Sequence, residues 1–251
     1  MNTPRWCVLI PCLNEEAAIR PVVESVLALG APVIVIDDGS DDRTADIVAA
    51  LPVTLLRHTQ RRGKGEALRR GFREALRQGY DAVVTMDGDG QHLAADIPRM
   101  VAAAARYPGH IVIGARLLDK QQQPKGRRRA NAVADWGVSW ACAQPVADTQ
   151  SGQRWYPRAA LELVDLPAEH FVFEAAILIV ASREKKIGVV SVPIASRYHG
   201  PFRPSHFNPV RDVVRITVYT IGRVVHYGHI IASYRRSRGA PTIVQEQREV
   251  V

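Results

Sequence analysis

From Cys7 to about Arg116, short apolar runs alternate with longer stretches whose apolar residues recur at helical spacing. The runs are apolar on both faces, as buried strands are. Strands and helices in this order predict an α/β fold with a mostly parallel central sheet that helices cover on both sides. The predicted strands are 8–10, 33–36, 53–56, 82–84 and 111–113, and the predicted helices are 15–29, 44–51, 65–78 and 94–106.

A polar, basic segment at 119–129 interrupts this pattern. It is too long and hydrophilic for a packed connection, so we expect either a disordered loop or a lid over an active site. The chain after it predicts a helix at 130–143 that carries two tryptophans and a turn at 148–152. A helix at 173–185 and a strand at 188–194 follow.

The segment 209–234 has an apolar stripe at helical spacing, with Arg211, Arg215 and Arg223 largely on the opposite side. This pattern is typical of an interfacial helix that buries its apolar face in lipid and offers arginines to anionic head groups. The same periodicity fits a surface helix packed on its own domain. We expect a basic membrane-associating segment over 201–238 and a flexible tail over 239–251. The stripe consists of Val210, Val213, Val214, Val218, Ile221, Val224 and Val225.

Composition narrows the class of protein. The 251 residues suit one large domain or two small ones, and 47% hydrophobic with 23% charged residues excludes disorder for most of the chain. The formal net charge of +8 indicates an anionic partner, which could be nucleic acid, a phosphorylated substrate or an acidic membrane surface.

Cysteines and apolar segments bear on the compartment. Cys7, Cys12 and Cys142 have no metal-ligand spacing and leave an odd thiol, so we expect small core residues in a reducing compartment. The sequence has neither a recognisable signal peptide nor the ~20-residue apolar stretch of a transmembrane helix. We therefore expect a protein that is soluble or rests on a membrane.

Polar clusters follow three of the predicted strands, at the sheet edge where ligands of parallel sheets gather. In the most informative one, Asp87 and Asp89 are spaced i, i+2 and Gln91 follows two residues later. Their oxygens can converge on one hard cation such as Mg²⁺ or Mn²⁺. A solvated turn is the alternative for this stretch alone, but the coincidence of three clusters favours a site. The clusters are Asn14-Glu15-Glu16, Asp37-Asp38-Gly39-Ser40 and Asp87-Gly88-Asp89-Gly90-Gln91-His92.

With its motifs in this order, the chain resembles a family 2 glycosyltransferase. The most similar branch contains dolichol-phosphate mannosyltransferase and bacterial polyprenyl-phosphate sugar transferases. The resemblance covers about residues 8 to 200. It rests on several motifs that occur in the family's order, since no single motif is specific. The motifs are Val8-Leu9-Ile10-Pro11-Cys12-Leu13-Asn14-Glu15-Glu16, Ile36-Asp37-Asp38-Gly39-Ser40-Asp41-Asp42-Arg43-Thr44, Gly63-Lys64-Gly65, Asp87-Gly88-Asp89-Gly90-Gln91-His92, Gly114-Ala115-Arg116 and Asp148-Thr149-Gln150-Ser151-Gly152-Gln153-Arg154.

The resemblance implies a GT-A-like nucleotide-sugar-binding fold over 1–200, with a donor half at about 7–118 and an acceptor half at about 130–200. It implies Mg²⁺- or Mn²⁺-dependent, inverting transfer of a sugar from a nucleotide-sugar donor to a lipid-linked acceptor such as a polyprenyl phosphate. The expected place is the inner face of the cytoplasmic membrane, with peripheral contact to anionic lipid and no nucleic-acid partner. The implied site residues are Pro11, Asn14, Glu15, Asp38, Lys64, Asp87, Gly88 and Arg116 for the donor, Asp87, Asp89 and Gln91 for the metal, and Asp89, Asp148 and Arg129 for catalysis.

Several of these residues have a structural alternative. Asp38 accepts hydrogen bonds from a base or ribose, or it caps the next helix. Lys64 reaches a phosphate, or it is a solvated lysine at a helix start. Arg116 and Arg129 suit phosphate oxygens because the guanidinium fork matches them. Asp148 orients the acceptor or acts as a base, or it caps the turn at 148–152.

Three functions compete with this interpretation. A saccharide or lipid hydroxyl acceptor would need a true base, for which Asp148 or Glu174 is the candidate. A nucleotidyltransferase would use the same metal pair and release pyrophosphate. A nucleic-acid-binding module fits the charge, but no recognised motif supports it. The sequence also departs from the family at Gln153, where a Phe is frequent, and meets the Arg-x-x-Gly-x-Ser motif only loosely at 197–205.

Overall fold

The computed structural model describes residues 4–119, 125–168, 172–196 and 209–245. Its centre is a 7-stranded sheet in the order β3-β2-β1-β4-β6-β5-β7, in which every pairing is parallel except those of β6. The predicted α/β fold with a mostly parallel central sheet is therefore confirmed. The strands are β1 Trp6–Cys12, β2 Val33–Asp37, β3 Thr54–Arg57, β4 Ala82–Thr85, β5 Ile111–Ala115, β6 Arg154–Pro157 and β7 Val189–Pro193.

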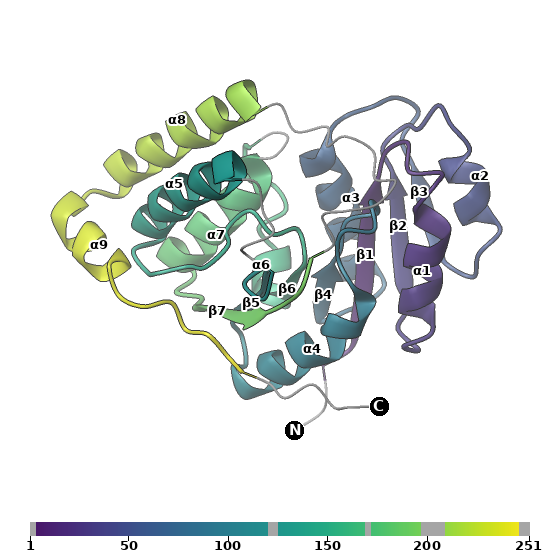
Figure 1. Cartoon of the computed structure of the whole chain (residues 1–251), viewed down its shortest axis with the longest axis horizontal. Helices are drawn as coiled ribbons and strands as arrows, with labels where there is room; N and C mark the ends of the chain where they lie inside the picture. The colour runs from purple at the N-terminus through teal and green to yellow at the C-terminus, as the bar shows by residue number, and fades with distance from the viewer. Residues whose placement is uncertain (1–3, 120–124, 169–171, 197–208, 246–251) are drawn as a thin grey trace.

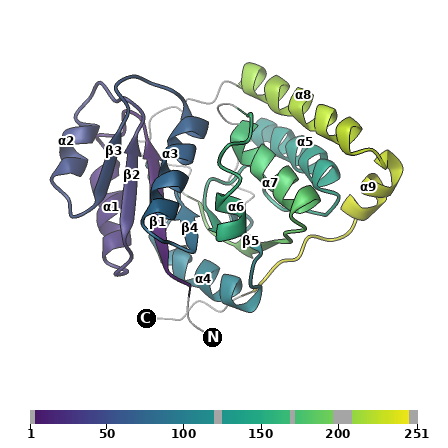
Figure 2. The same cartoon turned by 180° about the vertical axis from the view of Figure 1, so that it is seen from behind.

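Helices cover both faces of this sheet (Figures 1 and 2). Alternate residues of β1 point into two separate cores: Cys7 and Leu9 pack with α3 and α7, whereas Val8 and Ile10 pack with α1 and α4. All three cysteines are buried, as predicted. The helices are α1 Ile19–Leu27, α2 Thr44–Ala49, α3 Lys64–Arg77, η1 Ala94–Asp96, α4 Ile97–Arg106, α5 Lys125–Cys142, α6 Arg158–Leu161, α7 Val172–Glu184, α8 Pro209–Tyr227 and α9 Ile230–Ser237.

The predicted strands are all present, but one strand was missed. Strand β6 lies between β4 and β5 and runs antiparallel to both, with Trp155 opposite Val84 and Val112. It carries a buried arginine, Arg154, at its start, so its sequence lacks the apolar run that marks its neighbours.

The prediction of an irregular loop over 119–129 is wrong for 125–129, because α5 begins at Lys125. The part of that loop at 120–124 lies outside the described residues. Arg129 is accordingly an exposed residue near the start of a helix and not a residue of an irregular loop.

The C-terminal region differs from the prediction at two points. The helix expected over 209–234 is two helices, because Gly228 and His229 adopt φ of 62° and 49° between α8 and α9. The tail that we expected to be flexible over 239–251 contacts the sheet in its described part. Ser191 of β7 donates its N–H to Thr242 O at 2.9 Å and accepts one from Val244 at 2.8 Å, and Val244 is buried. Residues 246–251 lie outside the described residues.

Helix α8 has two apolar faces. Ile216 and Val224 are buried against the domain, where α8 contacts α5 and α7. Val214, Val218, Ile221 and Val225 recur at helical spacing on a different face and are exposed. In the described part of the chain, no helix combines the length and apolarity needed to cross a membrane.

Candidate active site

Three polar loops leave the carboxyl ends of β2, β1 and β4, which are neighbours in the sheet. The loops after β1 and β2 are joined by hydrogen bonds: the Asn14 N–H donates to Ser40 Oγ at 2.8 Å, and the Asp41 N–H donates to Asn14 Oδ1 at 2.9 Å. Asn14 adopts φ of 56°, which asparagine tolerates better than most residues. The predicted convergence of the polar clusters at one sheet edge is therefore present.

Other predicted donor residues line the same edge. Pro11 is buried in β1, and the Glu15 N–H donates to Thr44 Oγ1 at 2.7 Å. Gly88 lies so close to β1 that an added Cβ would stand 3.1 Å from Cys12 Cβ. A side chain at position 88 would therefore require Cys12 or Ile19 to move slightly.

The buried Asp38 carboxylate organises the loop that precedes α3. Its Oδ1 accepts the Arg62 N–H at 2.9 Å and lies 2.8 Å from His58 Nδ1, and its Oδ2 accepts the Gly63 N–H at 2.7 Å. The alternative in which Asp38 caps α2 is wrong, because another residue holds that N-cap position. These bonds fix the point where α3 begins and so place Lys64, its first residue.

Lys64 lies between two carboxylates from different parts of the chain. Its Nζ is 2.7 Å from Asp87 Oδ1, after β4, and 3.2 Å from Glu174 Oε2, in the first turn of α7. Burial alone would lower the pKa of the ammonium, but Asp87 and Glu174 raise it above its usual value. Burial raises the pKa of Asp87, yet the basic groups around it, Lys64 first and then His92 and Arg116, together outweigh burial and lower it. Lys64 is thus charged, and not a solvated helix-start lysine.

Asp87, Asp89 and Gln91 leave β4 together. Asp87 Oδ2 lies against Gly152, where an added Cβ would collide with it, and Asp89 Oδ1 accepts the Gln91 N–H at 3.0 Å. Within the described ranges there is no cluster of three or more His, Cys, Asp or Glu side chains that could hold a metal ion. Two carboxylates and an amide oxygen still form a suitable donor set for Mg²⁺ or Mn²⁺ that takes its other ligands from substrate phosphates and water. The residues present fit such a cation.

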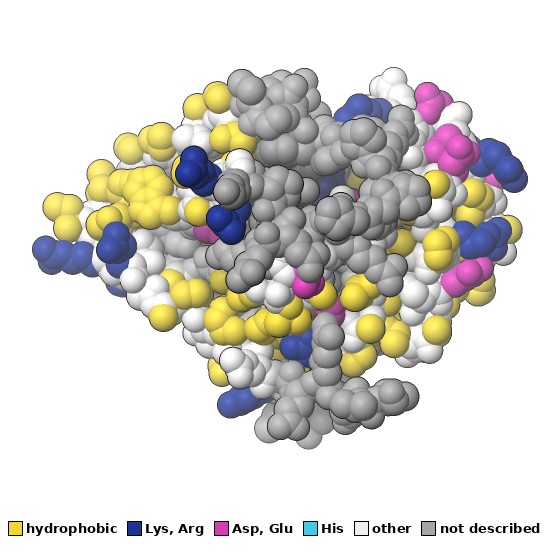
Figure 3. Space-filling model, in the orientation of Figure 1, with side chains coloured by type: hydrophobic (Ala, Val, Ile, Leu, Met, Phe, Trp, Pro, Cys, Tyr) yellow, Lys and Arg dark blue, Asp and Glu magenta, His cyan; other side chains and the backbone are white. Residues whose placement is uncertain are grey.

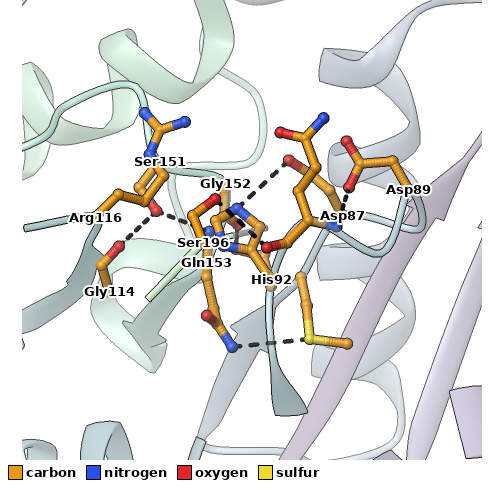
Figure 4. A network of polar contacts seen from close by, with 12 residues as sticks. Asp87, Asp89, His92, Gly114, Arg116, Ser151, Gly152, Gln153 and Ser196 are labelled. Atoms are coloured by element: carbon orange, nitrogen blue, oxygen red, sulfur yellow. Dashed lines mark hydrogen bonds and ion pairs between the residues drawn. The ribbon is translucent and has the colours of Figure 1, made fainter. Parts of the chain in front are cut away.

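His92 is a site residue to which sequence reasoning gave no role. Its Nε2 lies 4.0 Å from Asp87 Oδ2, and its Nδ1 has no hydrogen-bond partner among the described residues. Burial lowers the pKa of His92 to about 4, so the ring is neutral at pH 7. In Figure 4 it lies with Gly152 between Asp87 on one side and Arg116 on the other.

Arg116 and Asp148 form a buried, bidentate ion pair. Arg116 Nε donates to Asp148 Oδ2 at 2.8 Å, Nη2 donates to Oδ1 at 2.6 Å, and the Arg116 backbone N–H donates to Oδ2 at 2.7 Å. Burial raises the pKa of Asp148, but these bonds and the charge of Arg116 lower it overall. Asp148 is therefore an ionised partner of Arg116, and a weak base for deprotonating a hydroxyl.

Arg154 stabilises the turn at 148–152 through hydrogen bonds to its backbone, a role that the sequence did not indicate. Its side chain is almost fully buried and donates to the carbonyl oxygens of Thr149, Ser151 and Glu174 at 2.7, 2.7 and 3.0 Å. Arg154 is the last residue of the motif at 148–154, but its partners lie in the turn and in α7. Only the fold brings them together.

The two tryptophans predicted on a helix in the acceptor half differ in their contacts. Trp136 on α5 is half exposed, and Trp140 packs on it while its indole N–H donates to the Ile230 carbonyl oxygen at 3.1 Å. Trp140 therefore anchors α9, whereas Trp136 faces outward. The loosely matched motif at 197–205 lies outside the described residues.

Comparison with known proteins agrees with this geometry. The model of the family described as "Glycosyl transferase family 2" matches residues 7–165. The chain is 28% identical to a UDP-N-acetylglucosamine–dolichyl-phosphate N-acetylglucosaminyltransferase of Methanococcus voltae over 76% of this chain and 85% of the relative. It is 29% identical to the polyprenol monophosphomannose synthase of Mycolicibacterium smegmatis over 66% of each chain.

A solved structure shares the fold. Glucosyl-3-phosphoglycerate synthase from Mycobacterium tuberculosis, in complex with Mn²⁺, UDP and phosphoglyceric acid, superposes with a TM-score of 0.65 at 22% identity, covering 89% of this chain and 78% of that one. At this identity the likeness concerns the fold alone.

Proposed function

Because the chain belongs to glycosyl transferase family 2 and is a glycosyltransferase, we propose that it moves a sugar from a nucleotide-sugar donor to a polyprenyl phosphate, with inversion and with a divalent cation. The observation that carries the proposal is the site itself. Two carboxylates after β4 lie beside the charged Lys64, and a second cation, Arg116, is held in place by Asp148. Relatives that are named as lipid-phosphate sugar transferases support the choice of acceptor.

The donor side combines anionic and cationic groups. Asp87, Asp89 and Gln91 would hold the Mg²⁺ or Mn²⁺, which when bound stabilises negative charge on the leaving nucleoside diphosphate. Lys64 adds a buried positive charge beside them that can pair with a phosphate oxygen. The loops after β1 and β2 are connected by the hydrogen bonds of Asn14, and we propose that they bind the nucleoside.

The acceptor side favours a phosphate over a hydroxyl. A phosphomonoester has its second pKa near ~6 and is already ionised at neutral pH, so it needs no base. Asp148 is bound by Arg116 with a lowered pKa, and Glu174 is paired with Lys64, so both proposed bases are already engaged. We assign Asp148 to positioning Arg116. The resemblance implied that Arg116 binds the donor, but because Asp148 holds it we propose instead that its guanidinium would orient the acceptor phosphate.

We further propose that the enzyme docks on anionic lipid through an apolar helix face built from α5, α8 and α9. Figure 3 shows hydrophobic side chains gathered over these helices, with Lys and Arg at the far end. Arginines on α9 flank the exposed apolar residues, and each contributes on the order of 1 kcal/mol near an anionic surface. This charge pattern favours a membrane over an uncharged partner. The apolar helix face consists of Val133, Trp136, Val214, Val218, Ile221, Val225, Ile230 and Ile231, and its arginines are Arg235, Arg236 and Arg238.

This proposal combines the two interpretations of the C-terminal helix. One face of α8 packs on the domain, and the other contributes to a surface that would contact lipid. The enzyme would then meet its lipid acceptor at the inner face of the cytoplasmic membrane without crossing it.

The proposal is tested by comparing two acceptors that differ in one group. A panel of nucleotide sugars with Mn²⁺ first identifies the donor by its thermal shift. The donor is then incubated with a polyprenyl phosphate or with the polyprenol of the same length. We expect sugar transfer to the phosphate and at most traces to the alcohol. Equal transfer to the alcohol would favour the hydroxyl alternative, and release of pyrophosphate would indicate a nucleotidyltransferase.

A further inference from the structure

We propose that the Lys64 ammonium is a built-in counter-ion that makes cation binding at Asp87 depend on the donor's diphosphate. This inference rests on the proposed function, because it concerns how the same site assembles. The observation behind it is a partly buried triad in which Lys64 Nζ lies 2.7 Å from Asp87 and 3.2 Å from Glu174. The side chains of Lys64, Asp87 and Glu174 are 19%, 26% and 11% exposed.

The ammonium competes with a divalent cation for Asp87. A full positive charge 2.7 Å from Oδ1 weakens the attraction of that carboxylate for a second cation, and a partly buried pair is screened less than a pair at the surface. A metal ion arriving alone would meet this positive charge. A diphosphate arriving alone would meet the carboxylates of Asp87, Asp89 and Glu174.

Arrival of cation and diphosphate together resolves both conflicts. The diphosphate gives the ammonium an anionic partner, and the lysine's flexible four-carbon stem allows its charge to turn from Asp87 toward a phosphate oxygen. Asp87 is then available to the cation. Each ligand therefore strengthens the binding of the other, as linkage requires.

Glu174 makes this exchange possible without stranding a buried charge. It approaches from α7, in the acceptor half, and its Oε2 lies 3.2 Å from the same ammonium that Asp87 contacts. Removing the only partner of a buried charge is strongly unfavourable, so a lysine paired with Asp87 alone would resist release. A second carboxylate keeps Lys64 paired during the change.

The test measures the affinity for Mn²⁺ by electron paramagnetic resonance, first with Mn²⁺ alone and then with the nucleoside diphosphate of the donor found in the thermal-shift panel. Lys64→Met should bind Mn²⁺ alone at least roughly 10-fold more tightly than wild type. The factor by which the diphosphate strengthens Mn²⁺ binding should fall by a similar amount. Lys64→Arg, which keeps the charge, should bind Mn²⁺ alone as weakly as wild type.

Two further variants secure the interpretation. Lys185→Met removes one exposed positive charge at the other end of α7 and should leave both affinities unchanged. If Lys64→Met is unstable, the double variant Lys64→Met/Glu174→Gln takes its place, because it also removes the carboxylate that would be left without a counter-ion. It should fold and bind Mn²⁺ alone more tightly than wild type.

The outcomes separate this inference from the proposed function. If Lys64→Met and the double variant bind Mn²⁺ alone no more tightly than wild type, the counter-ion proposal is wrong while the metal site stands. If wild type fails to bind Mn²⁺ even with the diphosphate, the metal assignment at Asp87 and Asp89 is wrong, and this inference falls with it.

Discussion

Replacing Asp148 by Asn tests whether this carboxylate positions Arg116 or acts as a base. The change removes the charge that faces a buried guanidinium and sets an amide N–H₂ against a guanidinium N–H. Removing one partner of a buried ion pair costs about 3–5 kcal/mol. Because Asn keeps one acceptor oxygen and nearly the same shape, we expect a loss of about 2–4 kcal/mol in the free energy of unfolding at pH 7. Acceptor KM should rise more than kcat falls.

The pH dependence of this loss follows from the pKa. Arg116 holds the pKa of Asp148 below its value of ~3.9 in an unfolded chain, so the stabilisation is present above pH ~4 and lost as the pH falls through the folded-state pKa. In urea unfolding series, the difference between wild type and Asp148→Asn should therefore be largest near neutrality and shrink below pH ~4.

Asp135 offers a matched control. Its carboxylate accepts two bonds from Thr149 through one oxygen, at 2.7 Å each, which Asn can retain. Burial raises the pKa of Asp135, so the charge of this carboxylate works against folding and not for it. Asp135→Asn should be neutral or slightly stabilising there. The account of Asp148 is refuted if Asp148→Asn unfolds like wild type while kcat collapses and recovers at high pH, because that is the behaviour of a general base.

Three further variants address the cation, the β4 loop and the lipid surface. Asp89→Ala should lower turnover by orders of magnitude in dilute Mg²⁺ while the protein stays folded; near-full activity would refute the metal assignment. Gly152→Ala pushes its Cβ into Asp87 and should weaken Mn²⁺ binding at least several-fold, whereas Gly188→Ala, which meets a histidine side chain, should leave Mn²⁺ affinity unchanged. Val218→Glu should reduce co-sedimentation with phosphatidylglycerol vesicles in the full-length protein, whereas Leu29→Glu, at an exposed apolar position in the turn after α1, should not. Equal losses for those two would exclude a specific lipid-binding face.

Much of the fold was predictable because buried parallel strands are apolar on both faces. The runs that became β1, β2 and β4 needed no tertiary information. Strand β6 was missed because it is short, starts with an arginine, and gains its place from pairing on both sides. The break between α8 and α9 had a signal in Gly228, but the apolar periodicity continues across it.

The site was predictable to the level of residue types at one sheet edge. What the sequence could not supply were the partners. Lys64 meets Glu174, and Arg116 meets Asp148, only because α7 and the turn at 148–152 fold over the donor half. Because of those contacts we propose Asp148 as a positioning residue and not as a base.

The proposed reaction, metal-dependent transfer of a sugar to a lipid phosphate, can be followed directly by ³¹P nuclear magnetic resonance. The reaction contains the donor, a polyprenyl phosphate in detergent and Mg²⁺. We predict that the phosphomonoester resonance converts to a phosphodiester as the nucleotide sugar gives way to a nucleoside diphosphate, and that chelating the Mg²⁺ stops both changes. Consumption of the nucleotide sugar with an unchanged phosphomonoester resonance would contradict the account.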